Sequence, residues 1–307
     1  MKVSLISTVK DSALHVEEFL GSVAVQTRAP DEVVIVDGGS TDGTLELLRR
    51  EAGVTVIEER GANIARGRNL AIAAAAHDVL AVTDADCVLE SDWLERLLEP
   101  LGAGADVAMG FYAPRTDGFL QDCMAAVNLP SSADEVDPAR FMPSARSVAF
   151  RRSAIESAGG YPEWLDIGED MWVNHRWREL GLEMRFVPGA VVHWRLRPGL
   201  RSTWIQYFRY ARGDARAGMY PERHAVRFGV YAGLTVALIS PRTWPKLAAA
   251  GGAATYARAP MRRARRRLPD RRERAFAAVV VPALMGWIDT AKMAGYAVGL
   301  VDRAKVP

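Results

Sequence analysis

Residues 33–44 read VVIVDGGSTDGT, and this stretch decides the fold class. Four consecutive apolar residues predict a strand that is covered on both faces, as the strands of parallel sheets are. The acid Asp37 ends the strand, and Gly38 and Gly39 let the backbone turn sharply and approach a ligand closely. An acid at this place either caps the helix that follows or holds a ligand at the carboxyl edge of the sheet.

The same alternation of short apolar runs and amphipathic segments continues on both sides of this stretch. Strands are predicted at residues 3–9, 33–36, 54–58 and 79–83, and helices at residues 15–26, 44–52 and 64–75. Such an alternation predicts a largely parallel sheet with right-handed crossovers. Ligands bind these sheets at the carboxyl ends of the strands. Asp37 and Asp84 each follow a strand, so we expect them to face the same crevice.

The pattern is weaker in the second half of the chain. Prolines and serines interrupt residues 117–143, which are predicted to form a loop that shapes an acceptor site. Further strands are predicted at residues 147–150, 184–187 and 190–193, and helices at residues 170–180 and 202–217.

Composition sets broad limits on partners and compartment. The 307 residues suit one large domain or one domain with an appendage, and a net charge of +2 does not indicate a nucleic-acid partner. Cys87 and Cys123 form no disulfide framework or metal-finger spacing, which fits a reducing cytoplasm. The first residues lack the pattern of a signal peptide.

The C-terminal third combines apolar and arginine-rich segments. Residues 228–239 and 275–288 carry no charge, and nine arginines lie between residues 258 and 274. The apolar lengths suit buried or interfacial segments better than full membrane spans. Two spans would also place the arginines outside, against the positive-inside rule. We therefore expect this part to lie on the inner face of a membrane, with its arginines near anionic lipid; a single span by the second segment is the alternative.

Two acidic motifs could carry chemistry. Asp84 and Asp86 lie two residues apart in TDADC, so both side chains point to one side of an extended chain. Converging carboxylates repel each other unless a cation lies between them, and Mg²⁺ or Mn²⁺ suits that geometry. Glu169 and Asp170 open a predicted helix, where the helix dipole favours carboxylates. A solvated turn and simple helix capping are the alternative explanations.

The order of the motifs is more specific than any one of them, and it resembles the family 2 glycosyltransferases. The match extends over roughly residues 1–195, in the pieces VSLISTVKDSALHVEEFLGSV, DEVVIVDGGSTDGT, NIARGRNLAI, DVLAVTDADC, SVAFRRSAIESAGGYPEWLDIGEDMWVNHRWRELG and VVHWR. The resemblance implies a GT-A fold, which is a Rossmann-like, mixed and mostly parallel sheet flanked by helices. It implies a catalytic domain over residues 1–199 and leaves residues 200–307 as a helical, membrane-associating extension.

The resemblance also implies roles for residues that match the family's motifs. Asp37 would contact the base of a nucleotide, with Thr8, Arg68 and Asn69 nearby. Asp84 and Asp86 would hold the ribose and a diphosphate-bound Mn²⁺ or Mg²⁺, with help from His193, although a lone histidine is more often a hydrogen-bonded edge residue. Asp170 would be the catalytic base. Glu169 and Trp194 are expected beside the acceptor or supporting these residues.

The implied reaction is inverting transfer of a sugar from a nucleotide-diphosphate sugar to a hydroxyl of a glycan or lipid-linked acceptor. A UDP-sugar is the expected donor, although users of GDP-mannose or dTDP-rhamnose share these motifs. Two departures from the family pattern bear on this expectation: Gly38 replaces a second acid, and the Q-x-x-R-W motif of processive synthases survives only as Gln206, Arg209 and Tyr210. A processive polymerase is therefore disfavoured.

Two other classes of function compete with this interpretation. A sugar nucleotidyltransferase would share the sheet and the acidic metal site, but it should carry a glycine-rich, basic loop after the first strand, where this chain has TVKDSALH. A membrane or nucleic-acid adaptor would explain the arginines but would leave the acidic motifs unexplained.

Overall fold

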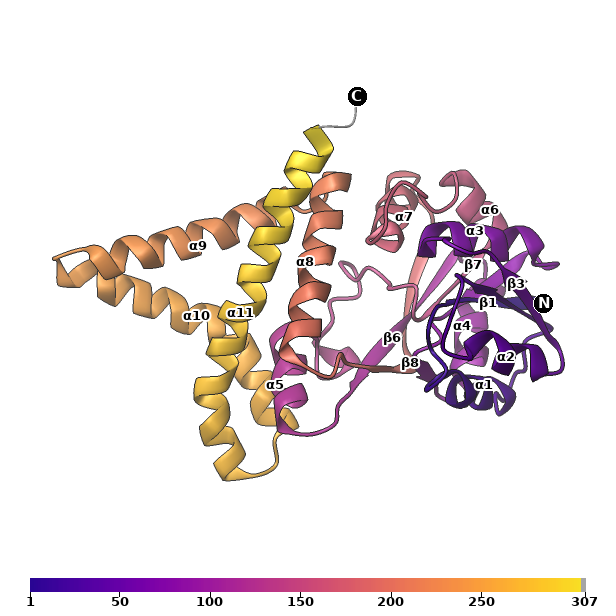
Figure 1. Cartoon of the computed structure of the whole chain (residues 1–307), viewed down its shortest axis with the longest axis horizontal. Helices are drawn as coiled ribbons and strands as arrows, with labels where there is room; N and C mark the ends of the chain where they lie inside the picture. Colours follow the sequence, from indigo (N-terminus) through magenta and orange to yellow (C-terminus); the bar gives the residue numbers. More distant parts are fainter. Residues whose placement is uncertain (305–307) are drawn as a thin grey trace. The chain divides into compact units, whose positions relative to one another are not determined.

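The computed structural model describes residues 1–304, which form two compact units (Figure 1). The first unit comprises Met1–Arg115 and Ser132–Arg195. The second unit comprises Thr116–Ser131 and the chain from Leu196 onward. Residues 116–131 thus belong with the C-terminal helices, although the sequence had placed them within the catalytic domain.

The first unit is built on one eight-stranded sheet with the order β3-β2-β1-β4-β7-β6-β8-β5. Neighbours are parallel from β3 to β4 and between β6 and β8, whereas β7 is antiparallel to both of its neighbours and β5 is antiparallel to β8. The sheet is therefore mixed, as expected. The strands are β1 (Val3–Val9), β2 (Glu32–Asp37), β3 (Val54–Glu58), β4 (Val79–Val82), β5 (Cys87–Leu89), β6 (Val107–Arg115), β7 (Val148–Arg151) and β8 (Met184–Arg195).

Helices cover both faces of this sheet. In β2, Val34 and Val36 point to one face and Ile35 to the other, and all three are at most 1% exposed, as predicted for a strand that is covered on both sides. The face with Val34 and Val36 packs against α3 and belongs to one core cluster that includes Ala71 of α3 and Trp177 of α7. The helices of this unit are α1 (Val16–Ala24), α2 (Thr44–Arg50), α3 (Ile64–Ala74), α4 (Trp93–Gly102), the 3-10 turn η1 (Ala133–Glu135), α6 (Arg152–Ser157) and α7 (Glu169–Glu179).

The strands predicted at residues 184–187 and 190–193 form the single strand β8. Its register against β6 jumps between Gly110, which pairs with Val187, and Phe111, which pairs with Val191, so the three intervening residues bulge. A Cβ atom at Gly110 would lie only 1.9 Å from Ser147 Oγ and 2.5 Å from Ala190 O. Only glycine therefore fits at position 110 of β6, where Ser147 and the bulged residue Ala190 approach the backbone.

The second unit is helical. It contains α5 (Phe119–Asn128), α8 (Leu200–Ala217), α9 (Pro221–Ile239), α10 (Thr243–Arg267) and α11 (Arg271–Ala304). The prediction of a loop at residues 117–143 is wrong for Phe119–Asn128, which form α5 and bury Cys123, Met124 and Ala126 against α10 and α11. This partner surface lies more than a hundred residues away in the sequence, which is why the local pattern is weak. From Leu129 to Pro143 the segment is a loop that contains only the 3-10 turn η1.

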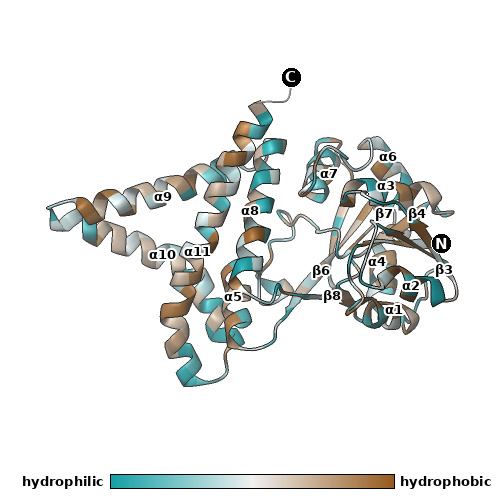
Figure 2. Ribbon diagram, in the orientation of Figure 1, coloured by the Kyte–Doolittle hydropathy of each residue, from teal (hydrophilic) through white to brown (hydrophobic). Residues whose placement is uncertain are grey.

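Helices α8 and α11 approach each other closely. Cβ atoms at Gly295 and Gly299 would lie 2.0 Å from Phe208 O and 2.4 Å from Arg212 O, so only glycine allows this contact. Figure 2 shows hydrophobic residues on the inner strands of the first unit and again along α9, α10 and α11. Among the described residues, α11 is the one helix long and apolar enough to cross a membrane.

Candidate active site

The carboxyl ends of the central strands bring several of the predicted residues to one edge of the sheet. Val9 of β1 lies in register with Asp37 of β2, and Ile6 of β1 lies beside Val82 of β4. Asp84 therefore follows β4 at the same edge as Asp37. Thr8 lies there too, packed against α3, since a Cβ atom at Gly67 would be 2.9 Å from its methyl group.

Asp37 holds the glycine-rich turn together. Its Oδ1 accepts hydrogen bonds from the backbone amides of Gly39 and Ser40, both at 2.8 Å, and its Oδ2 accepts one from Ser40 Oγ. The side chain is completely buried, and Gly39 has a φ of 88°, which other residues rarely adopt. These contacts stabilise the turn itself, and Asp37 does not cap the following helix, whose N-cap is Gly43. Contact with a nucleotide base stays a prediction.

Arg68 is the central cation of the site. Its side chain is 2% exposed and donates hydrogen bonds to Asp84 Oδ1 at 2.9 Å and to Glu169 Oε1. It also lies over the ring of Tyr161, 5.3 Å from its centre. One buried guanidinium thus joins the acid that follows β4 to the acidic pair at the start of α7.

The pKa values of this cluster follow from its burial and its excess of acids. Burial raises the pKa of Glu169 to about 7, against the opposing effect of Arg68 and with a further rise from Asp170. Burial by itself would lower the pKa of Arg68, but Glu169 and Asp84 raise it overall. Arg68 therefore stays charged and is shared among several carboxylates.

Asp84 and Asp86 are both half-buried on the loop between β4 and β5. Arg146 Nε lies 3.7 Å from Asp84 Oδ2, and Trp194 Nε1 donates to Asp86 Oδ2 at 3.3 Å. In residues 1–304 no three His, Cys, Asp or Glu side chains gather into a metal site. Two neighbouring carboxylates still fit Mg²⁺ or Mn²⁺, because these ions often bind one or two carboxylates and take their other ligands from water and phosphates.

The two acids that open α7 have different environments. Glu169 is 4% exposed and is engaged by Arg68, whereas Asp170 is half-buried. Asp170 Oδ1 accepts from the Met171 amide at 2.8 Å, and its Oδ2 accepts from the Ala145 amide at 3.3 Å. Asp170 is thus the acid of this pair that is held in place and reachable.

Two predicted site residues are used differently from expectation. The amide of Asn69 donates to Tyr161 O and Glu163 Oε1, and its oxygen accepts from the Tyr161 amide, so the side chain ties α3 to the loop before α7. The ring of His193 is hydrogen-bonded to Glu90. Successive residues of a strand point to opposite faces, so His193 points away from the side on which Trp194 reaches Asp86. Metal binding by His193 stays a prediction, and in this structure its ring is engaged by Glu90.

The structure adds residues that the sequence did not single out. Arg146 lies beside Asp84, and Ser144 Oγ lies 3.5 Å from Asp170 Oδ2. Both precede β7, which runs antiparallel to β4, so the start of β7 meets the carboxyl end of β4. The only signal in the sequence is a polar segment just before a predicted strand, which does not reveal the direction of that strand.

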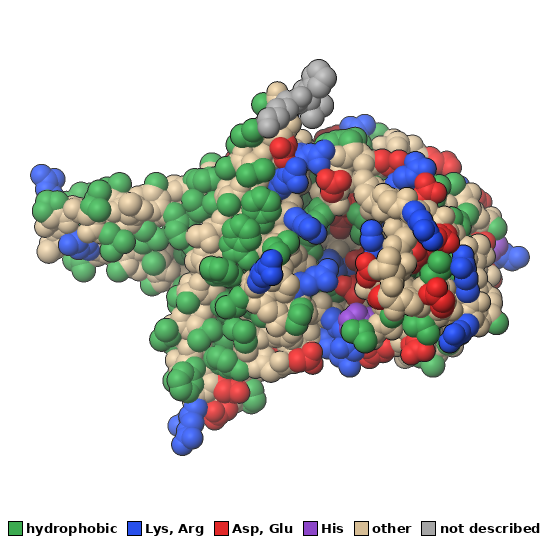
Figure 3. All heavy atoms as spheres, viewed as in Figure 1, with side chains coloured by type: hydrophobic (Ala, Val, Ile, Leu, Met, Phe, Trp, Pro, Cys, Tyr) green, Lys and Arg blue, Asp and Glu red, His purple; other side chains and the backbone are tan. Residues whose placement is uncertain are grey.

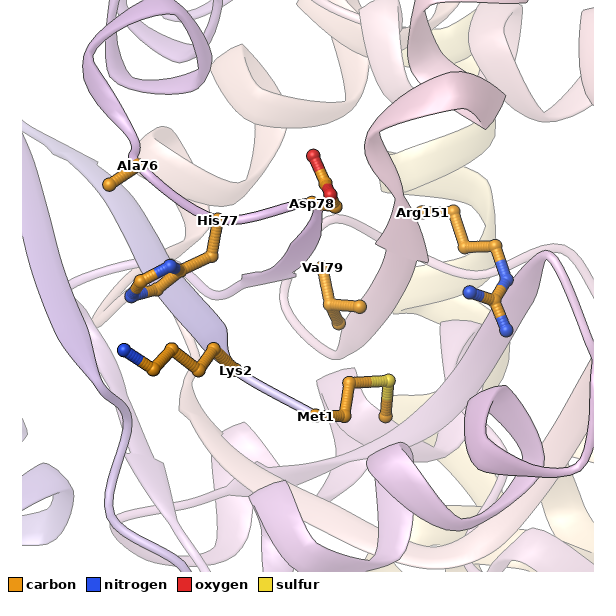
Figure 4. Close-up of a pocket in the computed structure, with 7 residues that line it drawn as sticks. All are labelled: Met1, Lys2, Ala76, His77, Asp78, Val79 and Arg151. Carbon is orange, nitrogen blue, oxygen red and sulfur yellow. The ribbon is translucent and has the colours of Figure 1, made fainter.

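A separate pocket of about 410 Å³ lies at the opposite edge of the sheet (Figure 4). Val3 and Val79 pair where β1 and β4 begin, and Val79 lines this pocket with Lys2, His77 and Arg151. Ligands of such sheets bind at the carboxyl ends of the strands, so this pocket is not the candidate site.

Comparison with known proteins agrees with the geometry. The family model for glycosyl transferase family 2 matches residues 4–157. The chain is 30% identical over 221 residues to succinoglycan biosynthesis protein ExoA of Rhizobium meliloti. This alignment covers 67% of each protein. It is 26% identical to glycosyltransferase AglE of Haloferax volcanii, over 71% of this chain and 74% of that protein.

A solved structure supports the fold. The mannosyltransferase PcManGT from Pyrobaculum calidifontis, in complex with GDP-Man and Mn²⁺, superposes with a TM-score of 0.58 at 19% identity, covering 99% of this chain and 87% of that one. The fold is thus the expected GT-A fold, with a helical extension. The family match and the relatives together show that the chain belongs to glycosyl transferase family 2 and is a glycosyltransferase.

Proposed function

We propose that the chain transfers a sugar from a nucleoside-diphosphate sugar to an acceptor hydroxyl with inversion, and that Asp170 is the general base. The observation that carries this proposal is the contrast between the two acids at the start of α7. Arg68 engages the buried Glu169, whereas Asp170 is half-buried and positioned by the Ala145 and Met171 amides. A base must be ionised and within reach of the proton that it removes.

The reaction is a direct displacement. A carboxylate oxygen of Asp170 takes the proton of the acceptor hydroxyl while the acceptor oxygen forms a bond to the anomeric carbon. The bond from that carbon to the diphosphate oxygen breaks, and the nucleoside diphosphate leaves with the electron pair. Attack from the side opposite the leaving group inverts the anomeric centre.

The D-x-D loop is proposed to hold the donor. Asp84 and Asp86 would bind a divalent ion, Mn²⁺ or Mg²⁺, which supplies Lewis-acid stabilisation of the departing diphosphate when bound. Arg68 and Arg146 fix Asp84 from two sides, at 2.9 Å and 3.7 Å. The GDP-Man and Mn²⁺ bound by PcManGT support a sugar nucleotide and a divalent ion for this fold.

The substrates are proposed only as classes. A UDP-sugar remains the expected donor, and GDP- and dTDP-sugars are the alternatives. The acceptor is proposed to be a glycan or a lipid-linked glycan; relatives include succinoglycan biosynthesis protein ExoA and O-antigen chain rhamnosyltransferase RfbN of Salmonella typhimurium.

The test is a thermal-shift screen of UDP, GDP, dTDP and CDP, each with and without Mn²⁺. A ligand that binds only the folded state raises its melting temperature according to occupancy. We expect one nucleoside diphosphate to stabilise the protein strongly, and only with the metal. No stabilisation by any of them would contradict the proposed donor site.

The variant Asp170→Asn tests the proposed general base. It should keep this stabilisation and lose turnover by roughly 10²–10⁴, the usual contribution of a general base. Unchanged turnover would show that Asp170 is not the base. The anomeric configuration of the product, read by NMR, tests inversion independently.

A further inference from the structure

The exposed face of α11 is apolar along nearly the whole helix. Residues 276, 279, 283, 287, 290, 294, 298 and 301 follow one another at spacings of three or four, so they share one face of the helix. Phe276, Val279, Trp287 and Val301 on this face are 67%, 74%, 45% and 54% exposed. Figure 3 shows hydrophobic side chains gathered over α11 and over much of α9 and α10.

This face carries no charged side chain between Arg274 and Asp302. Asp289 and Lys292 are the only charged residues in between, and both are turned to the other side of the helix. The 27 residues from 275 to 301 extend over about 40 Å of helix. A contiguous uncharged stripe of this length, unlike scattered surface hydrophobic residues, is typical of an interaction surface.

The opposite face of α11 is fixed inside the helical unit. Asp289 is 4% exposed and accepts hydrogen bonds from Arg227 Nε, Tyr231 Oη and Tyr256 Oη at 2.8, 3.1 and 2.8 Å. Lys292 Nζ donates to Asn128 Oδ1 at 2.8 Å. To cross a bilayer alone, α11 would have to lose these partners and bring both charges into hydrocarbon, which is costly.

Helices α9 and α10 add a second apolar surface. They form a hairpin in the helical unit (Figure 1), and its distal part exposes large hydrophobic side chains. These are Val236, Leu238, Ile239, Trp244 and Leu247, each at least 60% exposed. Tryptophan is enriched where membranes meet water, because its ring is apolar and its N–H is polar.

A strongly cationic segment joins α10 to α11. Nine arginines and only two acids, Asp270 and Glu273, lie between residues 258 and 274. Seven of these arginines are exposed: Arg258, Arg262, Arg265, Arg266, Arg271, Arg272 and Arg274. Cations beside an uncharged apolar face are complementary to a surface of anionic headgroups above hydrocarbon.

We propose that the helical unit binds an anionic membrane as a monotopic surface, with the exposed face of α11 and the distal part of the α9–α10 hairpin in the lipid interface. The arginines between residues 258 and 274 contact the headgroups. Nucleic acid would use the arginines but not the apolar stripe. A second copy of the chain would bring two arginine clusters together, which costs energy.

The test is cosedimentation of the full chain with vesicles of phosphatidylcholine, with or without phosphatidylglycerol. The variants Val279→Asp and Trp287→Asp place a carboxylate on the stripe. Their matched controls are Leu14→Asp and Trp164→Asp in the first unit, where the native side chains are 90% and 50% exposed. A triple variant, Arg262→Gln, Arg265→Gln and Arg271→Gln, tests the headgroup contact, with Arg50→Gln as control.

We expect the unmodified chain to bind vesicles that contain phosphatidylglycerol and to be released by alkaline carbonate. The stripe variants should lose at least tenfold in vesicle binding while their controls bind as the unmodified chain. Each arginine replaced should weaken binding to anionic vesicles about fivefold, as expected for a basic residue near such a surface.

Three results would overturn this proposal. Stripe variants that bind vesicles normally would show that α11 does not enter the interface. Resistance to carbonate would indicate a spanning helix. A dimer in solution that dissociates in Val279→Asp, with vesicle binding unchanged, would assign the face to a second copy.

This proposal depends on the helical unit and not on the proposed sugar transfer. The stripe variants should keep the thermal stabilisation that a nucleoside diphosphate gives the unmodified chain. Failure of vesicle binding and failure of nucleotide binding can therefore be told apart in the same preparations.

Discussion

The guanidinium of Arg146 lies 4.2 Å from the centre of the Trp194 ring system. The same arginine lies 3.7 Å from Asp84, and the same tryptophan donates a hydrogen bond to Asp86. Tyr112 lies on another side of the arginine, 5.6 Å away. A stacked cation and indole therefore connect both acids of the D-x-D motif to the end of β8.

Replacing the cation of this stack should impair catalysis more than stability. We expect Arg146→Met to lower kcat/KM by roughly tenfold or more, as loss of a charge-assisted contact worth about 1.5–3 kcal/mol would. Arg146→Lys should recover only part of this, because lysine lacks the planar group that stacks on indole. Steady-state kinetics with the sugar nucleotide measure the effect. The control is Arg185→Met: this arginine of β8 is exposed and pairs with Glu183, and its loss should leave kcat/KM unchanged.

The buried acid at the start of α7 should make stability depend on pH. Burial raises the pKa of Glu169 from 4.5 to about 7, so the folded chain holds a proton that the unfolded chain releases in this range. The contribution of this raised pKa to the free energy of unfolding is complete below pH 4.5 and is lost as the pH rises through 7. The loss amounts to roughly 3 kcal/mol, at about 1.4 kcal/mol for each pKa unit.

Glu169→Gln, which stays neutral, tests this dependence. Urea unfolding at several pH values between 5 and 8 should give the variant a flatter profile than the unmodified chain. Equal slopes for the two proteins would mean that Glu169 stays ionised beside Arg68 throughout.

The contact between α8 and α11 should tolerate no side chain at its closest point. Gly295→Ala would place a methyl group 2.0 Å from the carbonyl oxygen of Phe208, and the backbone would have to move. We expect a loss of roughly 1–3 kcal/mol in the free energy of unfolding, typical of overpacking. The control is Gly233→Ala in α9, where nothing lies within 4 Å, and it should be neutral or slightly stabilising. Equal melting temperatures for the two variants would contradict the close packing.

The sequence predicts the first four strands well because their apolar runs and turn residues are local signals. Strand β2 with its turn at Asp37 is the clearest case, since burial on both faces and the need for glycine are both visible in the sequence. Helix α5 is not predicted, because it is buried by helices distant in the sequence and has little local signal of its own.

The same distinction applies to the site. Asp84, Asp86 and Asp170 are found from motifs, but the place of Arg146 depends on β7 running antiparallel, which no local pattern reveals. His193 and Trp194 differ by a single position, yet the alternation of a strand sends them to opposite faces. The register of β8 against β5 decides which of these two side chains reaches the D-x-D loop.

The two acids of the D-x-D motif should respond differently to removal. Arg68 pairs with Asp84 and Glu169, so Asp86→Ala leaves both of these carboxylates in place; it should fold normally and lose mainly the metal-dependent part of donor binding. Asp84→Ala removes one of the two carboxylates that neutralise the buried Arg68, and it should lower the melting temperature as well, because an uncompensated buried charge is strongly destabilising. Calorimetry of nucleoside-diphosphate binding with Mn²⁺ and with a chelator, combined with melting curves, separates these effects. If Asp86→Ala binds the nucleotide as the unmodified chain does, and remains sensitive to the chelator, the metal is not held by this acid.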